Sequence, residues 1–303
     1  MSDIAAELGQ LVGADNVHIS EPMKDHISFR VGGPARYFVE PQKKDDLINV
    51  IKFLYGNGQP FFVVGNGTNL LVSDKGYDGT IVHISKNFSK ITVSENEIAA
   101  QSGAMLSKIA GQARDAGLAG FEFASGIPGT LGGACAMNAG AYGGEMKDIL
   151  ASAEILKKNG DVMTLPVSEL GMGYRTSIIK KLEYIVLAAR IVLTPGNPDE
   201  IQAKMDELAE KRREKQPINL PSAGSTFKRP EGYFAGKLIS DAGLKGFRIG
   251  GACVSEKHAG FVVNDKGASA ADVFEVIKHV RKEVKERFGV ELEPEVKFLG
   301  EFE

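Results

Sequence analysis

The sequence has little cysteine, no excess of charge of one sign and no long apolar run, and each shortage excludes a class of protein. Its two cysteines, Cys135 and Cys253, lie in apolar, glycine-rich runs, which indicates buried, reduced thiols rather than a disulfide framework or a metal site. The 36 basic and 39 acidic residues give a net charge of −3, so no basic excess indicates binding to nucleic acid or to an anionic membrane. No stretch reaches the roughly 18 apolar residues of a membrane span, and the N-terminus lacks a signal-peptide pattern. We expect a cytoplasmic protein.

Two common nucleotide-binding patterns are also missing, namely a G-x-G-x-x-G turn that opens a helix and a P-loop. Glycine, by contrast, is abundant: the chain has 36 glycines among 303 residues, well above the usual level of roughly 7 % of residues. They cluster at 65–67, 126–144 and 243–251, without a repeat or low complexity. Glycine clusters of this kind indicate places where the backbone turns tightly or approaches a ligand.

The hydrophobic pattern predicts a mixture of helices and strands. We expect helices over 43–55, 105–116, 199–214 and 269–289, strands over 61–65, 80–84, 184–193 and 294–300, and hairpins that turn at 95–96 and 159–160. At the second hairpin Asn159 and Gly160 are the two residues of positive φ that a tight turn needs. The last helix begins with the capping box of Ser269 and Asp272 and ends at Gly289.

The Pro-Gly-Asn-Pro stretch at 195–198 is the clearest break in the chain. We place a domain boundary there and expect an α+β fold. The predicted division is an N-terminal segment 1–29, a cofactor-binding domain 30–195 with subdomains of about 30–88 and 89–195, and a substrate-binding domain 196–303.

The first glycine-rich motif is "VVGNGTNLLV" at 63–72, in which an apolar run leads into five residues, Gly65, Asn66, Gly67, Thr68 and Asn69. Successive backbone N–H groups in such a turn can converge on an anion such as a phosphate. The alternative is a plain β-turn, because short glycine-rich turns are common.

The second motif is "ASGIPGTLGGACAMNAGAYGGE" at 124–145, which has seven glycines and hardly any charge. A flexible linker would be polar, whereas this segment keeps Ile127, Leu131, Cys135 and Met137 and is expected to be buried. Such backbone suits a ring system with a pyrophosphate tail, and Asn138 could meet its polar edges. Tight packing of bends is the alternative.

A third segment, "SAGSTFKRP" at 222–230, places Ser225 in a turn with no histidine nearby to activate it. Taken alone, Ser225 is a loop or N-cap hydroxyl. A catalytic serine here needs a reaction in which it is not a nucleophile.

These segments occur together with "SFRVGGPA" (28–35), "GYRTS" (173–177), "GLKGFRIGGACVSEKHAGFVVN" (243–264) and "LEPEV" (292–296). In this order the motifs resemble the UDP-N-acetylenolpyruvoylglucosamine reductase family, within the vanillyl-alcohol oxidase and p-cresol methylhydroxylase superfamily of FAD-binding proteins. The resemblance spans about residues 20–300. It implies a two-subdomain FAD-binding region of that type and a C-terminal α+β substrate domain.

The resemblance implies an oxidoreductase, UDP-N-acetylmuramate dehydrogenase, that acts in peptidoglycan synthesis and thereby in cell-wall biogenesis, cell shape, cell division and the cell cycle. NADPH reduces non-covalently bound FAD, hydride passes from the flavin to the enolpyruvyl group of the UDP-sugar, and the resulting enediolate needs a proton. Ser225 is implied as the proton donor, for which no histidine is required. Neighbouring cations or helix dipoles are expected to stabilise the alkoxide it leaves.

Further site residues follow from the same resemblance. Arg175 is implied to meet the substrate carboxylate and Glu295 to be the third catalytic residue, whose protonation the sequence leaves open. Tyr174, Arg212 and Lys215 are candidate substrate contacts, although each basic residue alone is more typical of a solvated helix. The implied FAD contacts are Gly65, Asn66, Gly67, Thr68, Asn69, Gly126, Ile127, Pro128, Gly129, Gly132, Gly133, Asn138, Gly140 and Ala141.

Two features of the sequence qualify the match. The spacing of Arg175 and Ser225 is too short for the family variant with an extra tyrosine-bearing loop, so the chain resembles the short-loop type. Arg229 stands where the family often has Asn. We expect no metal, no nucleic-acid or membrane partner, and a monomer. Two alternatives stay open: an FAD-dependent alcohol or sugar oxidase of the same superfamily, and a non-catalytic UDP-sugar-binding protein.

Overall fold

The computed structural model describes residues 4–303, and these residues group into two compact units that are each discontinuous in sequence. Unit 1 comprises the described part of 1–19 together with 37–66 and 79–211. Unit 2 comprises 20–36, 67–78 and 212–303. The expected mixture of helices and strands is confirmed, whereas the linear division at 30, 89 and 196 stays a prediction.

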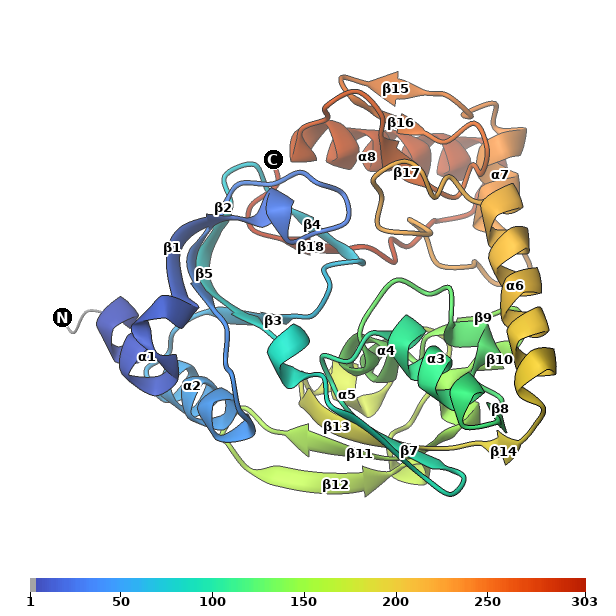
Figure 1. Cartoon of the computed structure of the whole chain (residues 1–303). Helices are drawn as coiled ribbons and strands as arrows, with labels where there is room; N and C mark the ends of the chain where they lie inside the picture. The colour runs from blue at the N-terminus through green and yellow to red at the C-terminus, as the bar shows by residue number, and fades with distance from the viewer. Residues whose placement is uncertain (1–3) are drawn as a thin grey trace. The chain divides into compact units, whose positions relative to one another are not determined.

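Unit 1 contains a five-stranded antiparallel sheet in the order β12-β11-β13-β7-β6 (Figure 1). Helices α3 and α4 pack with it around one hydrophobic core, in which Ile109, Leu131, Ile155 and Ile191 are fully buried. The elements are β6 (Ile91–Ser94), β7 (Glu97–Gln101), β11 (Leu150–Leu156), β12 (Val162–Pro166), β13 (Ile185–Val192), α3 (Leu106–Asp115) and α4 (Leu131–Met137).

One of the two predicted hairpin turns is wrong in detail. The β6–β7 turn lies at the predicted place, since Ser94 pairs with Glu97. The β11–β12 connection is instead a five-residue loop at 157–161, in which Gly160 has positive φ (90°) and Asn159 does not. The Gly160 N–H donates to the Lys157 carbonyl (2.9 Å), so a turn is followed by a left-handed glycine, which is the usual solution for longer hairpin loops.

A second sheet has the order β1-β2-β5-β3, with β3 and β5 parallel. Leu8, Leu47, Ile51 and Val82 belong to the core on which α1 and α2 pack. The predicted strand at 61–65 is present, but it is half-buried except at Val64. The elements are α1 (Ile4–Val12), β1 (Val17–Pro22), β2 (Pro34–Val39), α2 (Lys44–Gly56), β3 (Phe61–Val64) and β5 (Tyr77–His83).

Unit 2 contains a three-stranded sheet, β15-β16-β17, which packs on α8 (Figure 1). The predicted capping box of α8 is confirmed, because the Asp272 N–H donates to Ser269 Oγ and the Ser269 N–H donates to Asp272 Oδ2, both at 3.0 Å. Gly289 ends the helix with φ 69°. The elements are α7 (Ala235–Asp241), β15 (Arg248–Ile249), β16 (Ala252–Val254), β17 (Val262–Asn264) and α8 (Ala270–Phe288).

Unit 2 also joins two segments that are far apart in the sequence. Strand β4 (Leu70–Val72) runs parallel to β18 (Lys297–Leu299), which is shorter than the predicted strand over 294–300. In addition, the two oxygens of Asp74 accept the N–H groups of Ala270 and Ala271, each at 2.8 Å. A carboxylate at a helix N-terminus satisfies otherwise unpaired donors, so Asp74 ties the β4 segment to α8.

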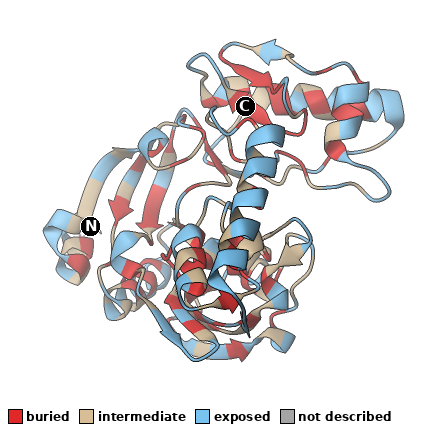
Figure 2. Cartoon of the chain, turned by 45° about the vertical axis from the view of Figure 1, so that its right-hand side comes forward, coloured by how far each residue is buried: buried red, intermediate tan, exposed pale blue. Residues whose placement is uncertain are grey.

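The remaining elements are short, apart from α6 (Pro198–Lys215). Helix α6 is exposed along most of its length (Figure 2). Its buried apolar residues are Ile201 and Leu208, and Met205 is half-buried. The short elements are η1 (Ala14–Asn16), η2 (Met23–Asp25), η3 (Lys86–Phe88), β8 (Leu118–Ala119), η4 (Glu122–Ala124), β9 (Gly140–Ala141), β10 (Gly144–Glu145), η5 (Met146–Asp148), η6 (Val167–Glu169), α5 (Ile178–Lys181) and β14 (Thr194–Pro195).

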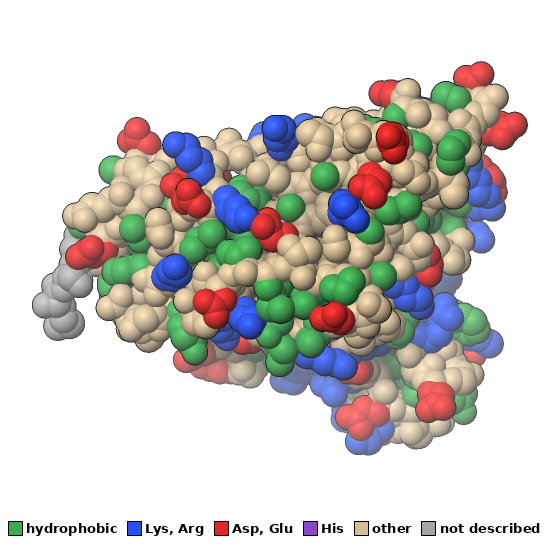
Figure 3. Space-filling view, turned by 90° about the horizontal axis from the view of Figure 1, so that it is seen from below, with side chains coloured by type: hydrophobic (Ala, Val, Ile, Leu, Met, Phe, Trp, Pro, Cys, Tyr) green, Lys and Arg blue, Asp and Glu red, His purple; other side chains and the backbone are tan. Residues whose placement is uncertain are grey.

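The thiols and the surface charge agree with the sequence analysis. Cys135 and Cys253 are free and buried, and burial raises the pKa of Cys135 to about 12, which makes that thiol unreactive. Acidic and basic side chains are interspersed with hydrophobic ones over the face drawn in Figure 3. Within residues 4–303 no helix combines the length and the apolar character needed to cross a membrane.

Candidate active site

The first glycine motif joins β3 to β4, and its first glycine lies against the second motif. A Cβ atom on Gly65 would lie 2.4 Å from Thr130 Oγ1. The two motifs, which are far apart in sequence, therefore meet in unit 1 where Gly65 contacts Thr130. Only a residue without a side chain allows this approach.

Gly67 is required by the fold of unit 2. Its φ is 58°, and a Cβ atom would lie 2.2 Å from the His26 carbonyl oxygen. Its own carbonyl accepts the Ser28 N–H at 3.1 Å. The "SFRVGGPA" segment thus packs directly on the first motif, which explains why a glycine is needed there whether or not a ligand is bound.

Helix α4 begins within the second motif. Two adjacent glycines of this helix have different surroundings. A Cβ atom on Gly132 would lie 2.9 Å from Ser102 Cβ, whereas one on Gly133 would have Thr130 Oγ1, at 3.9 Å, as its nearest neighbour. Gly133 is exposed while Leu131 and Cys135 are buried. The helix therefore has one packed side and one open side.

Burial of the second motif is less complete than predicted. Leu131 and Cys135 are buried, but Ile127 is half-buried and Gly126 and Pro128 are exposed. Backbone that is small, uncharged and open on one side suits a flat ring or a pyrophosphate. The residues present therefore fit a bound flavin nucleotide.

Asn138 ends α4 in the left-handed conformation, with φ 45° and ψ 57°, and its side chain is buried. The Nδ2 atom donates to Glu145 Oε2 (2.9 Å) and to the Gly173 carbonyl (3.1 Å), and Oδ1 accepts the Lys147 N–H (2.9 Å). The amide thus links the second motif to the segment that carries Arg175. Its predicted contact with a cofactor stays a prediction.

Arg175 lies in a two-residue turn between Gly173 and Thr176, whose backbones pair. Its φ of 54° is unusual for a residue with a side chain, and such strain concentrates at functional sites. Lys180 Nζ donates to the Arg175 carbonyl at 3.1 Å. The guanidinium lies over the Tyr174 ring, 5.1 Å from its centroid, and Nη2 is 3.5 Å from the Gly140 carbonyl. Arg175 is therefore next to the second glycine motif.

Glu145 supplies negative charge close to this arginine. Its carboxylate is 2.7 Å from Lys147 Nζ, and that hydrogen bond, with smaller contributions from Asn138 and Arg175, lowers the pKa of Glu145. Glu145 is therefore ionised near neutral pH and balances the two cations.

In unit 2 the serine turn lies beside the segment that contains Glu295. Phe227 pairs with Pro294 in an antiparallel bridge. The Glu295 N–H donates to the Thr226 carbonyl (2.8 Å), and the Lys228 N–H donates to the Glu293 carbonyl (2.9 Å). The two predicted segments, far apart in sequence, are thus joined by backbone hydrogen bonds, with Ser225 exposed and Glu295 half-buried.

Asn69 of the first motif reaches the same segment. Its Nδ2 donates to the Glu295 carbonyl at 3.0 Å, and its own carbonyl accepts the Lys297 N–H at 3.0 Å. Asn69 was predicted to contact the cofactor, and its contact with the Glu295 segment was not predicted. The missing signal is the β4–β18 pairing, which no local pattern reveals.

The predicted basic residues are found in different surroundings. Arg212 is half-buried and Lys215 exposed in the last turn of α6, where Lys257 Nζ donates to the Arg213 carbonyl. Lys228 pairs with Glu293. The Arg229 guanidinium lies 4.7 Å from the centroid of the Phe234 ring.

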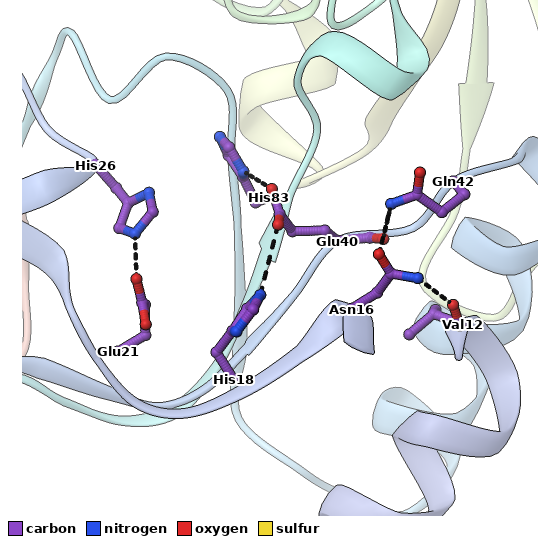
Figure 4. Close-up of polar contacts among 8 residues, drawn as sticks. All are labelled: Val12, Asn16, His18, Glu21, His26, Glu40, Gln42 and His83. Atoms are coloured by element: carbon purple, nitrogen blue, oxygen red, sulfur yellow. Dashed lines mark hydrogen bonds and ion pairs between the residues drawn. The ribbon is translucent and has the colours of Figure 1, made fainter. Parts of the chain in front are cut away.

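The histidines have partners of their own. Figure 4 shows His83 and His18 on either side of Glu40, at 2.9 Å and 3.6 Å, and His26 on Glu21 at 2.8 Å. These pairs stabilise the fold near β1 and β5. Among residues 4–303 no group of three or more His, Cys, Asp or Glu side chains is arranged to hold a metal ion.

Comparison with known proteins shows which families the chain resembles. Residues 35–166 match the family model of an FAD binding domain, and residues 216–299 match that of the C-terminal domain of UDP-N-acetylenolpyruvoylglucosamine reductase. The chain is thus similar to two families in the order that the motifs predict.

Relatives with the same name extend over the whole chain. The chain is 52 % identical over 302 residues to a UDP-N-acetylenolpyruvoylglucosamine reductase from Caldanaerobacter subterraneus subsp. tengcongensis, covering 99 % of this chain and 100 % of that one. A reductase of the same name from Clostridioides difficile is 50 % identical over 299 residues, with coverages of 99 % and 98 %. The crystal structure of UDP-N-acetylenolpyruvylglucosamine reductase from Thermus caldophilus matches with a TM-score of 0.79 at 34 % identity, over 94 % of this chain and 98 % of that one.

Proposed function

The chain belongs to the UDP-N-acetylenolpyruvoylglucosamine reductase family, and from this premise we propose that it reduces UDP-N-acetylglucosamine enolpyruvate to UDP-N-acetylmuramate with FAD and NADPH. The observation that carries the proposal is identity of about one half over the full length to reductases of that name. The same observation favours this reductase over a flavin oxidase or a non-catalytic UDP-sugar-binding protein.

The glycine-rich turns hold the cofactor in this proposal. Gly65 and Thr130 bring the two motifs together, and the open side of α4 at Gly133 leaves room along the backbone. The implied contacts are Gly65, Asn66, Gly67, Thr68, Asn69, Gly126, Ile127, Pro128, Gly129, Gly132, Gly133, Asn138, Gly140 and Ala141. When bound, FAD accepts a hydride from NADPH and passes a hydride to the enolpyruvyl group.

Arg175 holds the substrate carboxylate. A guanidinium presents two parallel donors to a planar anion, and charge grows on this carboxylate when the double bond is reduced. The turn that carries Arg175 is fixed by Lys180 on its carbonyl and by Asn138 on Gly173. The guanidinium is thereby placed before the substrate arrives, which is the condition for electrostatic stabilisation.

Ser225 gives its hydroxyl proton to the carbon that carries the negative charge. An enediolate carbon is basic enough to take a proton from a hydroxyl without a histidine as an intermediary. Lys228, three residues after Ser225 and paired with Glu293, is the cation that we propose for the resulting alkoxide. Glu295 acts next to this turn, either as a protonated carboxyl or by orienting a cation or the substrate.

Substrate contacts beyond the reacting group are proposed for Tyr174, Arg212 and Lys215. The two basic residues lie at the end of α6, joined to the 255–261 loop by Lys257, and suit the pyrophosphate of a UDP-sugar. The partners are small molecules. We further propose a cytoplasmic monomer whose product supports cell-wall biogenesis, and thereby cell shape, division and the cell cycle.

An anaerobic absorption spectrum of the purified protein tests the proposal. A flavin spectrum should bleach with NADPH and return with UDP-N-acetylglucosamine enolpyruvate. A protein that turns over with oxygen and an alcohol or sugar, without NADPH, is an oxidase. A colourless protein that cannot be reconstituted with FAD refutes the assignment of the glycine-rich turns.

A further inference from the structure

Thr226, the residue after Ser225, is completely buried in unit 2 and uses its polar groups to join three segments. Its N–H donates to the Gly260 carbonyl (2.8 Å) and its carbonyl accepts the Glu295 N–H (2.8 Å). Its Oγ1 accepts the Val262 N–H at 2.9 Å. A residue of the serine turn is thus bonded both to the Glu295 segment and to the segment at β17.

The side-chain hydrogen bond of Thr226 is the replaceable part of this arrangement. Val262 is buried, with 1 % of its surface exposed, so its N–H has no access to bulk water. A buried donor without a partner is costly, and the branched Thr side chain is stiff about χ1. The hydroxyl therefore fixes the position and orientation of the serine turn relative to β17.

Asn69 fixes Glu295 from the other side. While the Glu295 N–H is bonded to Thr226, the Glu295 carbonyl accepts from Asn69 Nδ2 at 3.0 Å. The peptide groups on both sides of the Glu295 Cα are therefore held, each by a different segment. One peptide unit separates the Thr226 carbonyl from Ser225.

From this arrangement we propose that Thr226 and Asn69 are positioning residues, which together hold Glu295 in register with the Ser225 turn. The inference rests on the proposed function, since it assumes that Ser225 and Glu295 act in the reduction of the enolpyruvyl group. Proton transfer requires a donor placed to within a fraction of an ångström, and a 1 Å displacement can cost about a hundredfold in rate. Neither residue needs to touch the substrate for its loss to slow this step.

Thr226→Val and Thr226→Ser form the matched pair that tests the first residue. Valine keeps the shape but removes the acceptor for the Val262 N–H, and serine keeps the acceptor. In anaerobic stopped flow we expect Thr226→Val to slow flavin reoxidation by the enolpyruvyl sugar by about 10- to 100-fold. Flavin content, the rate of reduction by NADPH and KM for the sugar should stay within about twofold of the wild-type values. Thr226→Ser should be reoxidised at a rate within about threefold of wild type.

Two results would overturn this role. The first is that Thr226→Ser is as slow as Thr226→Val, and the second is that reduction and reoxidation slow together. Wild-type protein that is reduced by NADPH but not reoxidised by the enolpyruvyl sugar refutes the proposed function instead, so the two failures are distinguishable.

Asn69→Asp tests the second residue. It also provides an independent test of the proposal if Thr226→Val does not fold. Aspartate keeps the size of the side chain but replaces the donor to the Glu295 carbonyl with a second acceptor. Once loaded with FAD, the variant should lose about tenfold or more in the reoxidation step. Loss of flavin with normal reoxidation after reconstitution would show that Asn69 serves the cofactor and not Glu295.

Discussion

The glycine-rich turns of unit 1 and the serine turn of unit 2 are built on opposite principles. In the first, Gly65 and Gly133 matter through the side chains they lack, since one allows close contact with Thr130 and the other leaves a helix side open. In the second, Thr226 is completely buried and its backbone and hydroxyl are hydrogen-bonded. A large cofactor needs room along the backbone, whereas proton transfer needs atoms in fixed places.

The largest effect is expected at the serine turn. Ser225→Ala removes the proposed proton donor without removing any contact of the glycine-rich turns. Reoxidation of the flavin by the enolpyruvyl sugar should slow by about 10²- to 10⁴-fold, while reduction by NADPH stays near normal. Ser222→Ala in the same loop is the control. Equal slowing of both half-reactions in stopped flow would rule out the proton-donor role.

A substitution in the glycine-rich turns of unit 1 should reduce cofactor binding instead of slowing a chemical step. Gly133→Leu places a side chain on the open side of α4, where a Cβ has only ordinary contact with Thr130 Oγ1 at 3.9 Å, so the fold should persist while FAD binding falls by at least about tenfold. Gly111→Leu, in α3, is the matched control, since its Cβ meets nothing within 4 Å and the nearest neighbour of a Cβ on Gly133 is Thr130 Oγ1 at 3.9 Å. Titration of the apoproteins with FAD measures both. Full flavin loading of Gly133→Leu would contradict the proposed cofactor position.

Arg175 should show opposite effects on stability and on activity. Arg175→Gly relieves the strain of a side chain at φ 54° and should raise the free energy of unfolding by up to about 1 kcal/mol. The same change removes the donor to the substrate carboxylate and should slow reoxidation by about 100-fold or more.

Glu95→Gly is the control for Arg175, because Glu95 has φ 52° in the exposed β6–β7 turn. It should gain stability with no loss of activity. Urea unfolding and stopped flow give the two quantities. An Arg175→Gly enzyme that is both more stable and fully active would remove Arg175 from the proposed site.

The smallest effect concerns His258 in unit 2. Burial, followed by the charge of Lys245, lowers the pKa of His258 below 6.5, and its Nδ1 accepts the Gly260 N–H at 3.1 Å. As the pH falls, His258 takes up a proton at a higher pH in the unfolded chain than in the folded protein. Its contribution to the free energy of unfolding should therefore be fully present above pH 6.5 and should be lost as the pH drops toward the lower pKa of the folded state. His258→Gln should flatten this part of the unfolding profile, measured in urea from about pH 5 to 8. An unchanged slope would contradict the assignment.

Local signals in the sequence predicted most of the helices and the two glycine-rich motifs. Helix α8 is an example, since Ser269, Asp272 and Gly289 mark both ends through hydrogen bonds that involve near neighbours in the chain. The same holds for the β6–β7 hairpin. Such features depend on residues a few positions apart, so a single sequence contains the information.

The parts that could not be predicted depend on contacts between distant segments. The three-residue strands β4 and β18 are too short to show a period, and their pairing places Asn69 on Glu295. The hydrogen bonds of the Asn138 side chain with Glu145, Gly173 and Lys147 were likewise not predicted, because Gly173 is 35 residues away in the chain. Thr226 carries no signal at all, because a threonine beside a serine looks like an ordinary turn residue.

The pairing of β4 with β18 also has a consequence for how the protein is made. During synthesis β4 emerges early and its partner β18 much later, since Asn69 and Glu295 are 226 residues apart. Domains fold as their residues leave the ribosome, so unit 1 can form on the nascent chain, whereas β4 in unit 2 stays without its partner until residues 297–299 have been made. A chain truncated by translation arrest before residue 297 would therefore lack this strand pair and expose the edge of β4 to the cell's quality-control machinery.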